Sequence, residues 1–454
     1  MVLDDLFERF LADAPACVML RALMEATLDP DELDRHLEAA SQGQYTRELL
    51  FSTLVDLMSL TVSGIRPSIH AAVRACRDRV KVSIQAVYGK LARTEEGVAR
   101  ELVAVTAGRF EAVRRALGAA RPLLAGYRTL VVDGNHLAGT QHRLKVTRRT
   151  LAAALPGQAL VVYQPELGLV TDVFPCQDAY AQERAILPQL LAAVRPGDLY
   201  LADRNFCTTG TLLDLAGRDA CFVIRRHGSS LCCRPIGPAR PAGHEGGRRL
   251  SEQALEVFDP KRGRRLRIRQ ITIHRSEQDP AQEDIHLLTN LPARVTARRI
   301  AGLYRQRWTI EDAFQDLTDH LGCEVHTLCY PKAALLAFCV ALVSYNLWAL
   351  TRAAIAQALG PKQEEEVSTY YLADEWRSTY RGMMIALPPP CWQRFQRMPA
   401  PELARQVLAM AARLDVPRYR RTPRGPKQPR PKRTSGKINH HVSTARLLAQ
   451  QNGP

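Results

Sequence analysis

Residues 333–350 contain no charged side chain, and this stretch constrains the fold more than any other part of the chain. A stretch of this length is just long enough to span a bilayer, so it must lie either in a membrane or in a protein core. It carries Ser344, Tyr345, Asn346 and Trp348, stands alone, and is surrounded by basic, soluble-looking sequence. We therefore expect a buried core helix and no membrane partner.

The length and charge of the chain narrow its class. At 454 residues, it should form two to four domains. A formal net charge of +16 suits a polyanionic partner, with DNA as the first choice and an inert basic surface as the alternative. The 11 cysteines include no C-x-x-C pair, which disfavours a zinc module. No signal-peptide pattern opens the chain, so we expect a reducing, cytoplasmic location.

Residues 1–118 are expected to form an all-helical domain. Within them, residues 66–93 contain two short helices in an arrangement similar to a helix-turn-helix, with Ser83 as the cap of the second. Its candidate exposed set has the chemistry that phosphates and base edges require. This set consists of Lys81, Gln85, Lys90 and Arg93. Most short helix pairs bind no DNA, so a purely structural domain is an equal alternative.

Strand patterns begin after residue 127, and two strands end in an acid. Apolar, β-branched runs predict strands at 129–132, 159–163, 169–174, 199–202 and 220–225, and helices at 178–194 and 209–215. Three strands followed by alternating helix and strand predict a mixed sheet with an antiparallel start. Asp133 and Asp203 follow the first and fourth of these strands, where functional carboxylates are well placed. A simple turn aspartate is the alternative for each.

Residues 227–290 interrupt this alternation with a basic β insertion. Short strands are expected at 255–258, 266–273 and 285–289. In the middle one the apolar alternation changes phase at Gln270, which predicts a β-bulge. The sheet-and-helix core thus comprises residues 119–226 and 291–357. The sequence assigns no function to the insertion.

The segment Y-R-Q-R-W-T-I-E places Tyr304, Arg307 and Glu311 at i, i+3 and i+7, which is one face of a single helix. Apolar residues on another face should pack inward. The alternative is an ordinary amphipathic helix with a solvated charged face. Asp312 is a rival acid, but it would point about 100° away from Glu311.

Three carboxylates from Asp133, Asp203 and Glu311 can form one site only if the fold brings them together. They would then repel one another, and a divalent cation relieves that repulsion. Oxygen ligands favour Mg²⁺ or Mn²⁺ over Zn²⁺. Two such ions can activate a water or a 3′-hydroxyl and stabilise the leaving oxygen in phosphodiester chemistry.

Three motifs in this order make the chain resemble DDE transposases with a ribonuclease-H-like core, and among them the insertion-sequence-four family. The motifs are V-V-D-G-N-H-L around Asp133, Y-L-A-D-R-N-F around Asp203, and Y-x-x-R-x-x-x-E from Tyr304 to Glu311. The family also has a β insertion between the second Asp and the Glu. The resemblance covers about residues 60–350.

The resemblance implies a role for each matched residue. Asp133, Asp203 and Glu311 would bind two Mg²⁺ or Mn²⁺ ions. Tyr304 and Arg307 would position a phosphate near the cleavage point. Trp308 would stack on a displaced base, with core packing as the alternative. Asn205 and Arg204 would orient Asp203 or contact the DNA backbone, with a purely structural role as the alternative. It also implies a homodimer in the DNA complex and a bacterial cytoplasm, at the nucleoid when the protein binds DNA.

One position departs from the family pattern. Where the family has a lysine seven residues after the Glu, this chain has Thr318, which would lie on the same helical face as Glu311. A threonine can bond a phosphate but supplies no cation. Either another basic residue substitutes, such as Lys332 or one in the basic loop 142–149, or activity is reduced.

Residues 358–415 should form a helical C-terminal region. Residues 416–454 are rich in cations and proline, and we expect a mostly disordered tail that binds DNA non-specifically. The whole pattern predicts a DNA transposase that cleaves at the ends of an insertion element and joins the 3′-hydroxyl ends to target DNA. The alternatives are a ribonuclease-H-like DNA nuclease and a catalytically impaired DNA-binding relative.

Overall fold

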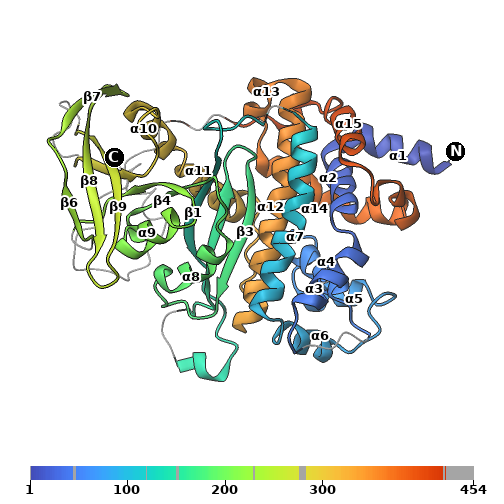
Figure 1. Cartoon of the computed structure of the whole chain (residues 1–454). Helices are drawn as coiled ribbons and strands as arrows, with labels where there is room; N and C mark the ends of the chain where they lie inside the picture. The colour runs from blue at the N-terminus through green and yellow to red at the C-terminus, as the bar shows by residue number, and fades with distance from the viewer. Residues whose placement is uncertain are drawn as a thin grey trace, which may run out of the picture.

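Helix α12 (Pro331–Leu359) runs through the middle of the molecule, with a mixed sheet on one side and a helical region on the other (Figure 1). The computed structural model describes residues 2–43, 48–118, 120–149, 153–228, 231–275, 283–422 and 425. Of the predicted tail, 416–454, the first residues are ordered, with the 3-10 helix η6 (Val416–Tyr419) and a buried Tyr419. Residues 423–424 and 426–454 of that tail lie outside the described residues.

Helix α12 is long and apolar enough to cross a membrane, but 89% of its most apolar window is buried inside the protein. The prediction of a buried core helix is therefore confirmed. The buried Asn346 side chain accepts a hydrogen bond from Val170 N at 2.8 Å and donates one to Val170 O at 2.8 Å. Asn346 thus fastens α12 to the backbone of a strand, which explains an amide in so apolar a helix.

The helical region contains both the N-terminal and the C-terminal helices. Its elements are α1 (Val2–Asp13), α2 (Pro15–Thr27), α3 (Pro30–Ala40), α4 (Phe51–Val62), α5 (Ile69–Ala75), α6 (Ile84–Leu91), α7 (Glu96–Ala116), α13 (Pro361–Glu366), α14 (Thr369–Ala386) and α15 (Ala400–Ala411). Buried residues from Phe7 to Tyr419 belong to one hydrophobic cluster. The predicted helical regions at the two ends of the chain therefore share a core with α12.

The sheet has ten strands in one continuous arrangement. They are β1 (Arg128–His136), β2 (Gln158–Gln164), β3 (Leu169–Cys176), β4 (Asp198–Ala202), β5 (Cys221–Arg225), β6 (Cys233–Pro235), β7 (Arg240–Glu245), β8 (Arg248–Asp259), β9 (Arg264–Ile273) and β10 (Ile285–Thr289). The order is β3-β2-β1-β4-β5-β10-β9-β8-β6, and β7 pairs with β8. Strands β3, β2 and β1 are antiparallel, whereas β1, β4 and β5 are parallel, as predicted.

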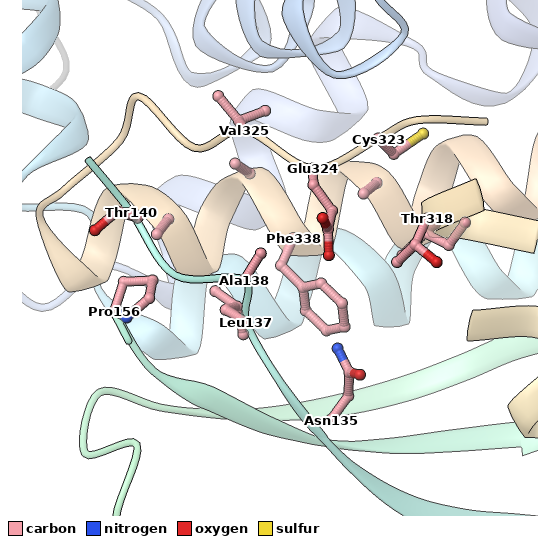
Figure 2. Close-up of a pocket in the computed structure, with 14 residues that line it drawn as sticks. Asn135, Leu137, Ala138, Thr140, Pro156, Thr318, Cys323, Glu324, Val325 and Phe338 are labelled. Carbon is pink, nitrogen blue, oxygen red and sulfur yellow. The ribbon is translucent and has the colours of Figure 1, made fainter. Parts of the chain in front are cut away.

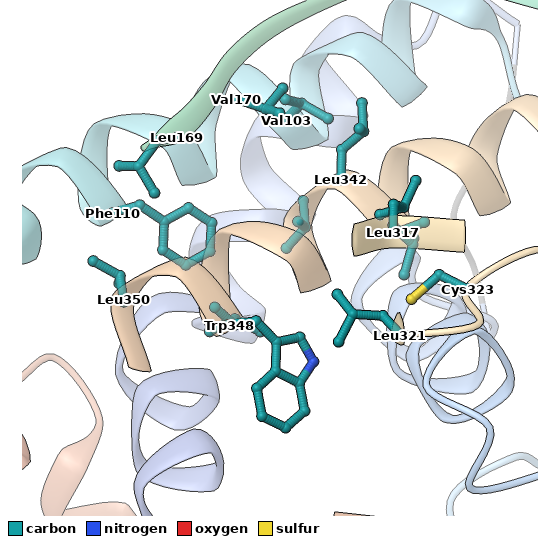
Figure 3. Packing of buried hydrophobic residues seen from close by; sticks show 14 of the residues in the cluster. Val103, Phe110, Leu169, Val170, Leu317, Leu321, Cys323, Leu342, Trp348 and Leu350 are labelled. Carbon is teal, nitrogen blue, oxygen red and sulfur yellow. The ribbon is translucent and has the colours of Figure 1, made fainter. Parts of the chain in front are cut away.

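Helices cover both faces of this sheet. Helices α7 and α12 pack on one face, where Figure 3 shows Phe110 of α7, Leu169 of β3 and Leu350 of α12 close together. Helices α8 (Glu183–Ala193) and α9 (Thr209–Ala216) pack on the other. Helix α8 begins later than the predicted residue 178, because the segment before it forms a loop. In that loop Asp178 O accepts a hydrogen bond from Gln158 Nε2 at 3.0 Å.

The β insertion extends the core sheet, because β10 pairs with both β5 and β9. The prediction of a bulge at Gln270 is wrong, since β9 keeps an unbroken register with β8 and β10. The change of phase has another cause, which is that both faces of β9 are packed. Ile268 lies in the cluster under α8 and α9, and Ile271 lies in the main cluster, on the face that α10 covers. Gln270 accepts a hydrogen bond from Arg226 Nη1 at 2.6 Å.

The predicted single helix around residue 304 is also wrong. The chain forms α10 (Ala297–Arg305), a turn at Gln306 and Arg307, α11 (Trp308–Gln315) and the π-helix η3 (Asp316–His320). Gln306 N and Arg307 N bond to carbonyls three residues back, at 2.9 and 3.1 Å, which tightens the turn. Both residues keep right-handed helical dihedral angles, so the two helices follow each other closely.

The insertion anchors α10. Glu245 of β7 pairs with Arg298 at 2.9 Å and also with Arg305, at the two ends of that helix. Just before α10, the Arg269 side chain donates to Pro292 O and Val295 O, each at 2.9 Å. The insertion thereby fixes the element that leads into Arg307.

Candidate active site

Asp133 and Asp203 are brought together by parallel pairing. Strands β1 and β4 are paired up to Val132 and Ala202, so the two acids follow the last pair side by side. The expectation that the first strand ends at Asp133 was incomplete, because β1 continues to His136 along β2. Asp133 therefore lies where β1 leaves β4 and stays paired with β2.

Arg307 connects Asp133 to the third acid. Its guanidinium lies 3.3 Å from the Asp133 carboxylate and 2.8 Å from that of Glu311. Its side chain is only 9% exposed, and its Nε is buried without a hydrogen-bond partner in the described part of the chain. A buried donor without a partner is costly, so this atom is well suited to an incoming acceptor such as a phosphate oxygen.

Tyr304 is 8% exposed, and its hydroxyl lies close enough to Arg307 to interact with it electrostatically. The predicted phosphate-contacting group is therefore mostly inside the protein and acts on Arg307. Burial raises the pKa of the Tyr304 hydroxyl, and the charge of Arg307 opposes this shift. Tyr304 stays protonated and can orient the guanidinium.

Burial raises the pKa of Asp133 to about 6. The Arg307 charge opposes this shift, whereas the carboxylates of Asp203 and Glu183 add to it. Asp133 and Asp203 therefore interact electrostatically, as a shared site requires.

Glu183 is an acid of this site that the sequence did not reveal. It lies in the first turn of α8, and its Oε2 accepts a hydrogen bond from Asn205 Nδ2 at 3.3 Å. The pattern placed Glu183 inside a longer helix, without any motif to distinguish it from a surface glutamate. The one sequence feature that points to this contact is the glycine after Asp133, because Gly134 leaves room for the Glu183 side chain.

Trp308 and Arg204 are exposed beside the acids. Trp308 is 56% exposed, and Arg307 Cζ lies 4.7 Å from its ring centroid. Core packing of Trp308, the predicted alternative, is therefore wrong. Arg204 is exposed in the short 3-10 helix η2 (Arg204–Phe206) after Asp203. The rival acid Asp312 is exposed and raises the pKa of Tyr163 rather than acting on Asp133.

Thr318 does not continue the face of Glu311 as predicted. Because η3 is a π-helix, with Leu321 N bonded to Asp316 O at 2.9 Å, residues after Gln315 leave the 3.6-residue phase. The Thr318 hydroxyl donates to Phe314 O at 3.1 Å, inside its own helix. Thr318 also lines a cavity with Asn135, Glu324 and Phe338, which Figure 2 shows.

This cavity is too small for a nucleobase. Its volume of about 40 Å³ gives room for roughly two or three water molecules. It lies between the end of β1, η3 and α12, and most of its wall is apolar.

The candidate DNA-binding set of the N-terminal domain is placed only in part as predicted. Ser83 caps α6 by accepting a hydrogen bond from Ala86 N at 3.2 Å, and Lys81, Gln85 and Arg93 are exposed. Lys90 is 7% exposed, donates to Leu49 O and lies 4.0 Å above the Phe51 ring. The prediction that Lys90 is exposed is wrong, because the short α6 turns this position toward α4.

The acids fit a divalent cation in their chemistry. Carboxylate oxygens are the ligands that Mg²⁺ and Mn²⁺ prefer, and Asp133 and Asp203 are adjacent. Within the described ranges, no three His, Cys, Asp or Glu side chains converge closely enough to hold a metal ion. Arg307 instead pairs with both Asp133 and Glu311. A cation would be held by Asp133 and Asp203, and Glu311 would have to leave Arg307 to join them.

Comparison with known families agrees with this geometry. Residues 125–347 match the family model described as "Transposase DDE domain". This segment is similar to transposase DDE domains. The matched segment contains Asp133, Asp203 and Glu311 and extends into α12, and it supports a DDE transposase as the general class of this chain.

Among solved structures, the chain is similar to a piggyBac transposase in a synaptic complex with hairpin DNA. The TM-score is 0.37 and the sequence identity is 11%, over 88% of this chain and 86% of that chain. None of the curated protein sequences matches this chain.

Proposed function

We propose that this chain is a DNA transposase of the insertion-sequence-four type. It cleaves DNA at the ends of an insertion element and joins the 3′-hydroxyl ends to target DNA. The observation that carries the proposal is the bridge from Asp133 through Arg307 to Glu311, beside Asp203, within the segment that matches transposase DDE domains.

Each residue of the site has a separate role in the proposed reaction. Asp133, Asp203 and Glu311 would hold Mg²⁺ or Mn²⁺, which, when bound, activates the attacking oxygen and stabilises the leaving oxygen. Arg307 binds the phosphate at the cleavage point, because its guanidinium can donate two parallel hydrogen bonds. Tyr304 holds Arg307 in place, and the exposed Trp308 ring is available to stack on an unpaired base.

The remaining surface supports DNA binding. Arg204 next to the acids, and Lys81, Gln85 and Arg93 on the helix pair of the N-terminal domain, are exposed and suited to phosphates and base edges. The net charge of +16 adds a non-specific attraction. We expect two copies in the DNA complex, on the basis of the family resemblance, and gel filtration with end DNA would measure this.

The proposal is tested with DNA that carries the inverted repeats flanking the gene. Protein, Mg²⁺ and this DNA are incubated, and strand cleavage and strand transfer are measured separately. Asp133→Asn, Asp203→Asn and Glu311→Gln should each abolish both steps and leave DNA binding intact. Asp312→Asn is the matched control, because it removes an exposed carboxylate from the same helix and should retain activity.

Other outcomes of these assays would favour one of the two alternative functions. Cleavage without transfer would favour a DNA nuclease. DNA binding without cleavage in the wild type would favour the impaired DNA-binding relative, with Thr318 in place of the family lysine as its cause. Full activity in Asp203→Asn would overturn the proposed site.

A further inference from the structure

The Glu183 carboxylate lies directly over the backbone of Gly134, next to Asp133. A Cβ atom at position 134 would be 2.2 Å from Glu183 Oε1 and 2.7 Å from its Cδ. With Glu183 in this position, there is no room for a side chain at position 134. Gly134 is thus needed for the close approach of this side chain.

Glu183 is joined to Asp203 through Asn205. The Asn205 side chain donates from Nδ2 to Glu183 Oε2 at 3.3 Å, and its backbone N donates to Asp203 Oδ1 at 2.7 Å. The neighbouring Arg184 donates from Nε to Asn205 O at 2.9 Å. The start of α8 therefore holds Asn205 at its side chain and at its carbonyl, while the amide of Asn205 fixes one oxygen of Asp203.

A surface glutamate would not need this arrangement. Glu183 is brought close to Asp133 and Asp203, whose charges repel it, and the chain has a glycine where the approach requires one. The hydrogen bond from Asn205 and the nearby His136 and Arg184 side chains offset part of this electrostatic cost.

We propose that Glu183 is a positioning residue for Asp203, acting as the hydrogen-bond acceptor that holds Asn205. This inference rests on the proposed function and adds a residue to it. Residues that orient a ligating carboxylate typically change activity or metal affinity by 10- to 100-fold when removed. In this role the acceptor oxygen of Glu183 matters, and its negative charge does not.

Two substitutions separate these properties. Glu183→Gln keeps an acceptor oxygen for Asn205 and removes the charge, whereas Glu183→Ala removes both. We expect Glu183→Ala to lower the rate of DNA cleavage about 10- to 100-fold with little change in DNA affinity, and Glu183→Gln to stay within about threefold of the wild type. Asn205→Ala should resemble Glu183→Ala, and the double variant should be no worse than either single one. Equal loss in Glu183→Gln and Glu183→Ala would overturn the proposal, because the charge would then be the active property.

A second measurement does not need activity. Mg²⁺ should raise the thermal unfolding midpoint, and the Mg²⁺ concentration needed for a given rise should increase about 10- to 100-fold in Glu183→Ala but not in Glu183→Gln. If the wild type cleaves no DNA, the proposed function fails, and this titration still decides whether Glu183 positions Asp203. An unchanged Mg²⁺ requirement for the same rise in Glu183→Ala would overturn the positioning role. Glu111→Gln is a matched control, because Glu111 also accepts a hydrogen bond on a helix but lies away from the acids.

The contact with Gly134 gives an independent check by a double-mutant cycle. Gly134→Ala should destabilise the wild type, because the new methyl group collides with Glu183. The same substitution should cost clearly less in the Glu183→Ala background, where the space is free. An equal cost in both backgrounds would mean that Glu183 does not lie over Gly134, and the proposal would fall with it.

Discussion

The guanidinium of Arg307 lies 3.3 Å from the carboxylate of Asp133, although the two residues are 174 positions apart. This ion pair joins the turn between α10 and α11 to the sheet. It also places a positive charge where acidic side chains gather. The negative charge of the site is thus partly offset by Arg307, and a phosphate or a cation must compete with this pair.

Replacement of Arg307 should affect stability and cleavage together. Arg307→Ala leaves the mostly buried Asp133 without its counter-charge, which should cost about 1–3 kcal/mol of unfolding free energy. Arg307→Lys should lose part of this unfolding free energy, because an ammonium group cannot donate two hydrogen bonds in fixed directions. Urea unfolding measures the change. Arg115→Ala removes an exposed pair with Glu111, at 2.7 Å, and should change stability by less than about 1 kcal/mol.

Mg²⁺ should stabilise the folded chain through the same acids. At 100 times its dissociation constant, a ligand that binds only the folded state adds about 2.7 kcal/mol. We expect a rise in the thermal unfolding midpoint with Mg²⁺, and its loss in Asp203→Asn. Asp219→Asn is the matched control, since this exposed residue has φ of 54°, a conformation that asparagine also adopts. A rise that persists in Asp203→Asn would place the cation elsewhere.

The sequence predicted the elements and acids that depend on local pattern. Asp203 follows a strand and Asp133 lies within one, the sheet starts antiparallel, and α12 is buried. These features follow from apolar runs and their spacing, which one sequence displays. The wrong prediction of a bulge at Gln270 has a physical reason. Alternation identifies a strand with one buried face, whereas β9 is packed on both, so its apolar residues change faces without a bulge.

The features that were missed depend on contacts between distant residues. Lys90 has the composition of a surface residue, and only the position of Leu49 and Phe51 makes it an interior one. Glu183 has the spacing of a surface helix, and only Gly134 and Asn205 make it part of the site. The π-helix after α11 also has no signature in the sequence, so the register of Thr318 could not be derived from a helical period.

Lys90 and Arg93 should separate stability from DNA binding. Lys90→Met leaves Leu49 O without its donor and should cost about 1–3 kcal/mol of unfolding free energy, with little change in DNA affinity. Arg93→Ala should leave stability unchanged and weaken DNA binding, with the salt slope reduced by about 1. Fluorescence anisotropy at several salt concentrations measures both variants. Weaker binding by folded Lys90→Met would contradict the assignment.

His286 should make the protein less stable in weak acid. Burial lowers the pKa of His286 below its usual 6.5, and the charge of Arg226 lowers it further. Other groups act on it more weakly, namely Asp284, His274 and Arg225. The folded state therefore disfavours the charged imidazole. The stability that comes from keeping His286 neutral is complete above pH 6.5 and is lost as the pH falls below it.

His286→Gln removes this titration, and its urea midpoint should fall less than that of the wild type between pH 7.5 and pH 5.5. His244→Gln changes an exposed histidine on β7 and should follow the wild type at both pH values. Parallel curves for the wild type and His286→Gln would contradict the prediction.

Asn346 should be the most sensitive position in α12. Its amide makes both a donor and an acceptor contact with the backbone of Val170, each at 2.8 Å, and it is fully buried. Asn346→Leu keeps the size and apolar character of the helix but leaves one N–H and one C=O of β3 unpaired, at about 1–3 kcal/mol each. The Ser344 hydroxyl instead bonds to Val340 O in its own helix, so Ser344→Ala should cost less than about 1 kcal/mol. Urea unfolding of the two variants compares them directly. A smaller loss for Asn346→Leu than for Ser344→Ala would show that α12 is held to the sheet by apolar packing alone.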